Sequence, residues 1–178
     1  MPIRTILLLG NPKLYEKSEL VQENEFSNIK ELITDLHDTL MDSRKRFGWG
    51  RAIAAPQIGV MKRVFYMYVD KPIVFINPSL HEKSIAQHDV WDDCFCFPDL
   101  FVKVLRHQNC RINYTDLDGH KQDLFVEGDL SELLEHEYDH LDGVLSVLKA
   151  IDKKSFALKS EISNLKNLAS GHNMGWLV

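Results

Sequence analysis

The sequence predicts an α+β fold in which antiparallel sheets pack around a central helix that carries an HExxH motif. Segments of strand-like composition are concentrated between residues 63 and 126, whereas helical periodicity precedes and follows them. Within that strand region, Asp118-Gly119 is typical of a tight hairpin turn between antiparallel neighbours. Because 178 residues can bury one sizeable core, we expect a single domain over residues 1–178.

The bulk composition argues against several classes of protein. A net charge of -5 and the lack of a long lysine or arginine block argue against direct nucleic-acid specificity. The apolar run over residues 6–9 is too short for a signal peptide or a membrane span. Three cysteines, two of them Cys94 and Cys96, do not make a disulfide framework. We therefore expect free thiols, a cytoplasmic location and no membrane contact.

The N-terminal region predicts an irregular arm over residues 1–25, followed by an amphipathic helix. This helix is expected to begin at Ser27 or Asn28 and to end at Gly48. Its apolar residues recur at helical spacing, namely Ile29, Leu32, Ile33, Leu36, Leu40 and Met41. Such a stripe is typical of a helix that packs on a core, so we expect it to carry no chemistry.

A run of small residues follows, from Gly48 to Gln57. Small side chains let a backbone approach a ligand or a neighbouring strand closely. The residues alone leave open whether this run is a tight loop or a binding edge. It is not a phosphate-binding loop, because no Lys-Ser/Thr pair follows the glycines.

Five segments in the middle of the chain predict strands by their apolar and β-branched composition. They are residues 63–69, 73–76, 100–105, 110–115 and 124–126. Asn77-Pro78 is expected to end the second of them, because proline interrupts a strand ladder.

The C-terminal region predicts one short strand and one helix. The strand is expected over residues 145–147, and the helix over about 154–168 with an apolar stripe on one face. The sequence does not indicate whether the tail, residues 169–178, is ordered.

The best-marked helix spans Leu130 to Leu141. Asp129 and Glu132 have the spacing of an N-terminal capping box, and Gly143 suits a left-handed stop after the last turn. Leucines on this helix supply apolar faces, so we expect it to pack against an antiparallel sheet.

This helix carries the sequence His136-Glu137-Tyr138-Asp139-His140. Histidines four residues apart lie on one face of a helix, one turn from each other, so His136 and His140 can reach one metal ion. Glu137 stands beside them and can accept a proton from a water. The alternative is a chance pair of surface histidines; the caps and the apolar flank favour the metal site.

A catalytic metal site needs a third protein ligand, and three sources compete. An HxxGxxH continuation is excluded, because Ser146 stands where its last histidine belongs. A second HExxH pattern takes a glutamate from a following helix, and Glu161 lies near that place, although it has polar neighbours. The third source is Cys94, whose thiolate is a stronger transition-metal ligand than a carboxylate. The residues alone leave Glu161 and Cys94 open.

Three segments together resemble the peptide deformylases, whose motifs are GxGxAAxQ, EGCLS and QHExxHLDG in that order. The corresponding segments here are residues 50–57, 92–96 and 135–143, and the N-terminal arm through Leu14 is also similar. The resemblance extends to about Ile151 and implies the fold and the chemistry of that family.

The resemblance implies one divalent metal ion held by Cys94, His136 and His140. Fe(II) is the native ion that it implies, with Zn, Ni or Co able to replace it. Glu137 would act as the general base and then as the general acid. Gln57 and the backbone N–H of Phe95 would hold the developing oxyanion.

The implied substrate is an N-formylated nascent peptide, met at the ribosome, from which formate is released. The peptide would lie extended along the edge formed by residues 50–53. The residues implied to bind it are Gly50, Arg51, Ala52 and Leu133.

Several residues depart from the family motifs. Ala52 replaces a glycine, Asp93 replaces a glycine, Cys96 replaces a serine, and Glu135 replaces a glutamine. If the segment is extended, Cys94 and Cys96 face the same side. Glu132 stands where the resemblance implies an apolar wall of a methionine pocket, and a carboxylate there would disfavour methionine.

Three hypotheses for the function follow. The first is removal of formyl groups by a metallohydrolase with Cys94 as ligand. The second is a metallopeptidase with Glu161 as ligand. The third, suggested by the departures, is a metal-bearing but catalytically silent relative that binds peptide ends.

Overall fold

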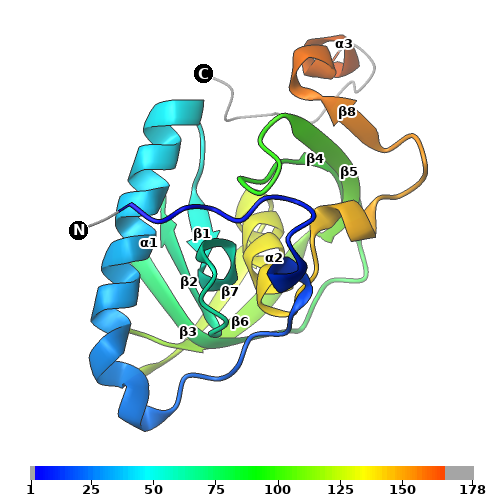
Figure 1. The fold of residues 1–178 in the computed structure, drawn as a ribbon. Helices are drawn as coiled ribbons and strands as arrows, with labels where there is room; N and C mark the ends of the chain where they lie inside the picture. Colours follow the sequence, from blue (N-terminus) through cyan, green and yellow to red (C-terminus); the bar gives the residue numbers. More distant parts are fainter. Residues whose placement is uncertain (1–2, 167–178) are drawn as a thin grey trace.

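The computed structural model describes residues 3–166 and contains two antiparallel sheets with helices between and around them (Figure 1). The strands are β1 (Ala52–Ala54), β2 (Val64–Tyr68), β3 (Pro72–His81), β4 (Gln87–Asp92), β5 (Leu100–His107), β6 (Asn109–Thr115), β7 (Lys121–Glu127) and β8 (Phe156–Leu158). The α-helices are α1 (Phe26–Phe47), α2 (Asp129–Leu141) and α3 (Ile162–Lys166). The predicted mixed fold with antiparallel sheets is therefore confirmed. None of the helices within residues 3–166 combines the length and the hydropathy that a membrane span requires.

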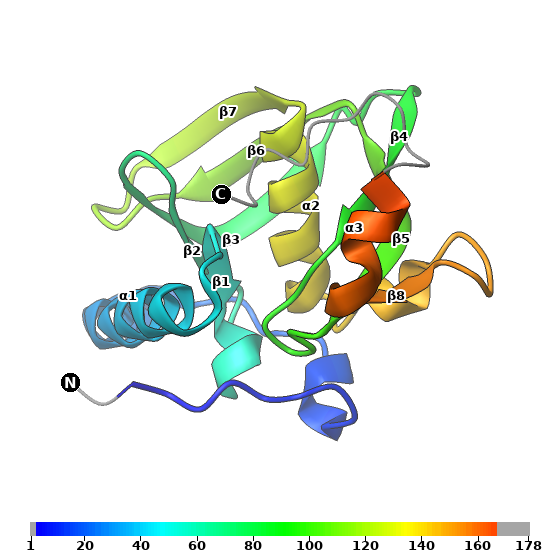
Figure 2. The ribbon, with the colours of Figure 1, turned by 90° about the horizontal axis from the view of Figure 1, so that it is seen from above.

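The two sheets are joined through α2. One sheet has the strand order β1-β2-β3-β6-β7 and the other has the order β4-β5-β8, with every pairing antiparallel. Helix α2 contacts β1 and β7 of the first sheet and β5 of the second, and Figure 2 shows it lying between them. Side chains of α2 can thus meet residues from both sheets.

Helix α1 packs on the outer side of the five-stranded sheet. Leu36 and Leu40 are fully buried there, and Gly48 ends the helix in the left-handed conformation with φ 81°. The predicted helix is thus present, beginning one or two residues earlier than expected. On the opposite face of the sheet, Phe65 stacks on Phe75 beneath the buried Leu134 of α2. The second of these apolar layers fixes α2 against the sheet, and the first covers the other face under α1.

The predicted end of the second strand at Asn77-Pro78 is wrong. Strand β3 continues to His81, with a shift of its register against β6 between Ile76 and Ser79. Asn77 takes φ 50° at this bulge, and its side chain bonds both the N–H and the C=O of Val21. The bulge accommodates the proline that would interrupt a regular ladder.

Two C-terminal predictions also need correction. Residues 145–147 do not form a strand, because Ser146–Lys149 form a 3-10 helix. The expected helix over 154–168 is replaced by β8, a 3-10 turn at Lys159–Glu161 and the short α3. Strand β8 pairs with the edge of β5, and this tertiary pairing overrides the helical periodicity. The tail, residues 169–178, lies outside the described residues.

Gly143 provides a test of how tightly the N-terminal arm packs against the end of α2. Its φ is 71°, and an added Cβ would lie 2.5 Å from the backbone oxygen of Tyr15. We expect G143A to lower the free energy of unfolding by about 2 to 4 kcal/mol, measured by urea denaturation. The control is G119A, which has a similar φ but no neighbour within 4 Å and should cost only about 1 kcal/mol. Equal losses would contradict the close packing.

Candidate metal centre

The structure brings together one thiol and two imidazoles from separate parts of the chain. Cys94 lies in the turn after β4, and His136 and His140 lie one turn apart on α2. The Cys94 Sγ is 3.3 Å from His140 Nε2, which is 3.2 Å from His136 Nε2. All three side chains are buried, and their ligand atoms lie within 4.8 Å of one another.

These three donor atoms have the spacing expected around a single divalent ion. Tetrahedral bonds of about 2.1 Å to nitrogen and about 2.3 Å to sulfur place donors about 3.3 to 3.6 Å apart. One sulfur and two imidazole nitrogens are also ligands that transition metals prefer over the hard oxygen ligands of Mg²⁺ or Ca²⁺. The residues present therefore fit a transition-metal ion.

A buried ionic network stands behind His136. The Nδ1–H of His136 donates to Asp92 at 2.8 Å, which directs Nε2 toward the other two ligands. Arg106, which is fully buried, donates to Asp92 and to Asp139, each at 2.6 Å. Lys149 supplies a second cation to Asp139 at 2.8 Å. The network ties the end of β4, strand β5 and helix α2 into one unit.

Protonation of the ligands follows from burial and these charges. Burial raises the pKa of the Cys94 thiol, and the neighbouring Cys96 raises it further. Burial opposes the charge of His136, but Asp92 outweighs it and raises the pKa to about 9. Burial lowers the pKa of His140, and the charge of the nearby His136 lowers it further. Without a bound cation, Cys94 is therefore a neutral thiol and His136 a charged imidazolium at pH 7.

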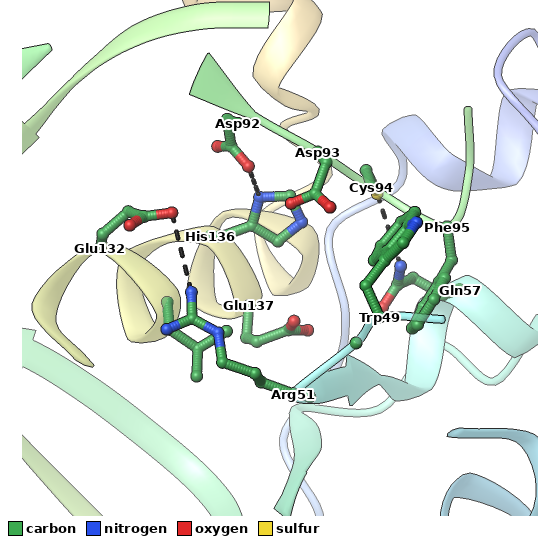
Figure 3. A pocket seen from close by; sticks show the side chains of 13 residues that line it. Trp49, Arg51, Gln57, Asp92, Asp93, Cys94, Phe95, Glu132, His136 and Glu137 are labelled. Carbon is green, nitrogen blue, oxygen red and sulfur yellow. Dashed lines mark hydrogen bonds and ion pairs between the residues drawn. The ribbon is translucent and has the colours of Figure 1, made fainter. Parts of the chain in front are cut away.

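Glu137 follows His136 on α2, and Figure 3 shows it in the same pocket as His136 and Cys94. It is buried, and its Oε2 has no hydrogen-bond partner among the described residues. Burial is the main reason that its pKa is raised to about 7, although His136 acts in the other direction. A carboxyl group with these properties can exchange a proton near neutral pH.

The amide of Gln57 faces the same pocket from the 3-10 helix Ala55–Ile58, which follows β1. Its Oε1 accepts the Ala54 N–H at 2.8 Å, which orients Nε2 toward Cys94 Sγ at 3.6 Å and Cys96 Sγ at 3.7 Å. The segment is a turn rather than an extended strand, since the Phe97 N–H bonds the C=O of Cys94 at 3.0 Å. Both thiols nevertheless face Gln57, so they lie on the same side of the turn.

A cavity of about 30 Å³ adjoins the ligands. It is lined by Trp49, Gly50, Arg51, Ala52, Gln57, Asp92, Asp93, Cys94, Phe95, Glu132, Leu133, His136 and Glu137. All the sequence-predicted substrate residues are thus brought to one place. At Gly50, with φ 127°, an added Cβ would collide with the Phe95 ring, which stacks on Trp49 at 4.7 Å.

Two of the motif departures have structural partners. Glu135 accepts the His107 N–H at 2.8 Å and pairs with Lys83 at 3.6 Å, so it fastens α2 to β5. The predicted capping box at Asp129 and Glu132 is wrong. Gly128 is the N-cap residue, and it makes no side-chain capping bond. The carboxylate of Glu132 instead points to the guanidinium of Arg51, 3.9 Å away.

The alternative third ligand does not reach the histidines. Glu161 lies in the exposed turn before α3, where its carboxylate accepts from Asn164 at 2.8 Å. Within residues 3–166, the buried group of potential ligands is Cys94, His136 and His140; the other group, at 116–120, is partly exposed. Sequence reasoning missed Arg106, because nothing local indicates that a strand arginine will meet two distant carboxylates.

The chain matches the family model described as Polypeptide deformylase over residues 3–156. A peptide deformylase of Pseudothermotoga lettingae is 34% identical over 161 residues, which cover 90% of each chain. A crystal structure of peptide deformylase from Thermotoga maritima gives a TM-score of 0.78 at 27% identity, covering 85% of this chain and all of that one. A peptide deformylase structure from Legionella pneumophila also gives 0.78 at 27% identity and covers 97% of this chain.

Metal affinity should depend on the hydrogen bond that His136 Nδ1–H donates to Asp92. We expect D92N to weaken binding of Zn²⁺ or Fe²⁺ by about 10- to 100-fold, since the ring loses the carboxylate that orients it. Chelator competition measures the dissociation constant. The control D89N removes a carboxylate from the same strand, where it pairs with Lys103 on the exposed side, and should leave affinity unchanged. Equal affinities for D92N and the unaltered protein would contradict the assigned network.

Metal binding should also release protons. Because the pKa values of Cys94 and His136 are both raised, the cation must displace a proton from each near neutral pH. We expect release of about two protons per ion, so the dissociation constant should fall about 100-fold between pH 6.5 and 7.5. Calorimetry in buffers of different ionisation enthalpy measures the release. A pH-independent affinity would contradict this ligand set.

Proposed function

The chain belongs to the peptide deformylase family and removes N-formyl groups from nascent peptides, and we propose that the reaction takes place in the pocket beside Cys94, His136 and His140. The observation that carries this proposal is the meeting of a thiol and two imidazoles next to the buried carboxyl of Glu137. We also propose that the chain forms one catalytic domain and acts in the cytoplasm, at the ribosome.

Cys94, His136 and His140 would hold one divalent ion, Fe(II) natively, with Zn, Ni or Co as substitutes. Their spacing and the sulfur among them support a transition metal. When bound, such an ion acts as a Lewis acid and makes water nucleophilic near neutral pH.

Glu137 would move the proton. It takes a proton from the attacking water as the C–O bond to the formyl carbon forms, and gives it to the departing amine as the C–N bond breaks. Its raised pKa, about 7, lets the same group serve first as base and then as acid. Its burial keeps bulk water away from this transfer.

Gln57 and the backbone N–H of Phe95 would stabilise the negative charge on the formyl oxygen. The Gln57 amide is held by the Ala54 N–H at 2.8 Å, so its Nε2 is oriented before the reaction begins. Phe95 is fixed by its stacking on Trp49. Donors fixed in this way stabilise developing charge without reorganising.

The peptide would bind as an added strand along residues 50–53. Strand β1 is an edge strand of its sheet, because within residues 3–166 it pairs with β2 alone. An extended peptide can hydrogen-bond the other side and place its formylated end at the ligands. Leu133 lines the same cavity from α2.

Removing only the proton carrier tests the mechanism. We expect E137Q to retain its metal and its fold but to lose at least about 1000-fold in kcat for formate release from formyl-Met-Ala-Ser, because the amide cannot accept the proton. Assays are anaerobic with Fe(II) restored. E161Q, which alters an exposed glutamate outside the pocket, should keep full activity. Normal turnover by E137Q would contradict the assigned base.

Removing the sulfur tests the ligand set. We expect C94A to lose its stoichiometric metal, measured by elemental analysis after gel filtration, whereas E161A keeps it. The reverse result would support a peptidase-type site. No turnover by the unaltered protein with full metal occupancy would instead support a silent peptide-binding relative.

A further inference from the structure

Two thiols lie together at the candidate metal centre, although only one of them belongs to the ligand set. Cys94 and Cys96 are both buried free thiols. Their sulfur atoms lie 3.6 and 3.7 Å from the same atom, Gln57 Nε2, and Figure 3 shows the first of these contacts. The N–H of Cys96 donates to the Cys94 Sγ at 3.5 Å, and its side chain also hydrogen-bonds that of Cys94. The two sulfurs are therefore within hydrogen-bonding reach of each other.

The backbone between the two thiols suits a covalent link. Because Cys94 and Cys96 are two residues apart, their Cα atoms are separated by less than about 7.6 Å even in an extended chain. Here the segment turns, since the Phe97 N–H bonds the C=O of Cys94 at 3.0 Å. A turn brings such Cα atoms closer, into the range of about 4.4 to 6.8 Å that disulfides span. Joining the sulfurs therefore requires no large movement of the chain.

The pocket gives a small reactant access to one of the two sulfurs. Cys94 lines the cavity, whereas Cys96 does not. Cys96 is only 1% exposed and packs in the apolar cluster that contains Leu14 and Leu145. A peroxide that enters the cavity would therefore meet Cys94 first, with Cys96 held beside it as a second thiol. This is the arrangement of an oxidisable cysteine and a resolving cysteine.

We propose that Cys96 is a resolving thiol, which joins Cys94 in a reversible disulfide when a peroxide oxidises the site and so removes the sulfur ligand. With hydrogen peroxide, the Cys94 sulfur forms an S–O bond as the O–O bond breaks, one oxygen leaves as water, and Cys94 becomes a sulfenic acid. The Cys96 sulfur then forms the S–S bond as the S–O bond breaks, and its proton leaves with the hydroxyl group as a second water. The two thiols together lose two electrons and two protons, and the peroxide is reduced to two waters.

The disulfide would change both metal binding and the fate of Cys94. The thiolate is the form of cysteine that binds metals, so a site with a Cys94–Cys96 disulfide would keep only its two imidazoles. A sulfenic acid without a neighbouring thiol is oxidised further to sulfinic and sulfonic acids, and these steps are irreversible for thiol reductants. Cys96 would thus turn a permanent loss of the ligand into one that a dithiol reverses. The inference rests on the proposed ligand set but not on the deformylase reaction.

The test follows the thiols of the Zn-loaded protein, because zinc has no redox chemistry of its own. Hydrogen peroxide should lower the count of free thiols from three to one and release the zinc, which a colorimetric chelator detects. Trypsin places Cys94 and Cys96 in one peptide, residues 84–103, and Cys110 in another, residues 107–111. Mass spectrometry should find the first peptide two hydrogens lighter and unreactive toward iodoacetamide. Dithiothreitol should restore all three thiols and zinc binding.

The variant C96S removes the resolving thiol and keeps the sulfur ligand. It should bind zinc as the unaltered protein does, but peroxide should add two or three oxygens to its 84–103 peptide. Dithiothreitol should then fail to restore zinc binding. The matched control is C110S, which removes a buried thiol on β6 that does not line the cavity. It should form the disulfide and recover as fully as the unaltered protein.

Two outcomes would overturn the inference. One is an unaltered protein whose 84–103 peptide gains oxygens or keeps both thiols free; the other is a C96S variant that recovers its zinc as fully as the unaltered protein. A reversible disulfide with zinc release, observed in a protein that releases no formate, would instead support the inference while the proposed function fails.

Discussion

The site depends on one buried guanidinium. Arg106 extends from β5 and bonds Asp92, which ends β4, and Asp139, which lies on α2. It therefore joins the sheet that carries Cys94 to the helix that carries both histidines. Burial opposes its charge, but the two carboxylates outweigh that cost and raise its pKa above the ordinary value. Separating Arg106 from Asp92 or Asp139 would leave a buried charge unpaired, which is strongly disfavoured. The positions of β4, β5 and α2 relative to one another are therefore firmly fixed.

The N-terminal arm performs a similar task at the other side of the pocket. The Leu7 N–H bonds the backbone oxygen of Gln57, and the Leu9 N–H bonds that of Cys96, both at 2.8 Å. These bonds align the small-residue segment with the cysteine turn. The pocket is thus assembled from three segments distant in sequence, residues 49–57, 92–95 and 132–137, and backbone or buried ionic contacts fix each of them.

What could be predicted from the sequence was local. The spacing of His136 and His140 and the periodicity of their helix follow from helix geometry, and the turn at Asp118-Gly119 follows from its φ requirement. Strand β4 escaped prediction, because its residues are mostly polar and its sheet is partly exposed. The partners of Arg51, Arg106 and Glu132 could not be predicted, since they depend on how separate elements pack. The residues alone left the third ligand open, and ordered motifs of a family favoured Cys94.

Every role assigned to the pocket requires one cation that the sulfur of Cys94 shares with the two imidazoles. X-ray absorption spectroscopy of the metal-loaded protein measures the distances from that ion to its neighbours. We expect one sulfur neighbour at about 2.3 Å and two imidazole nitrogens at about 2.0 to 2.1 Å from the ion. A spectrum with nitrogen and oxygen neighbours but no sulfur would contradict it.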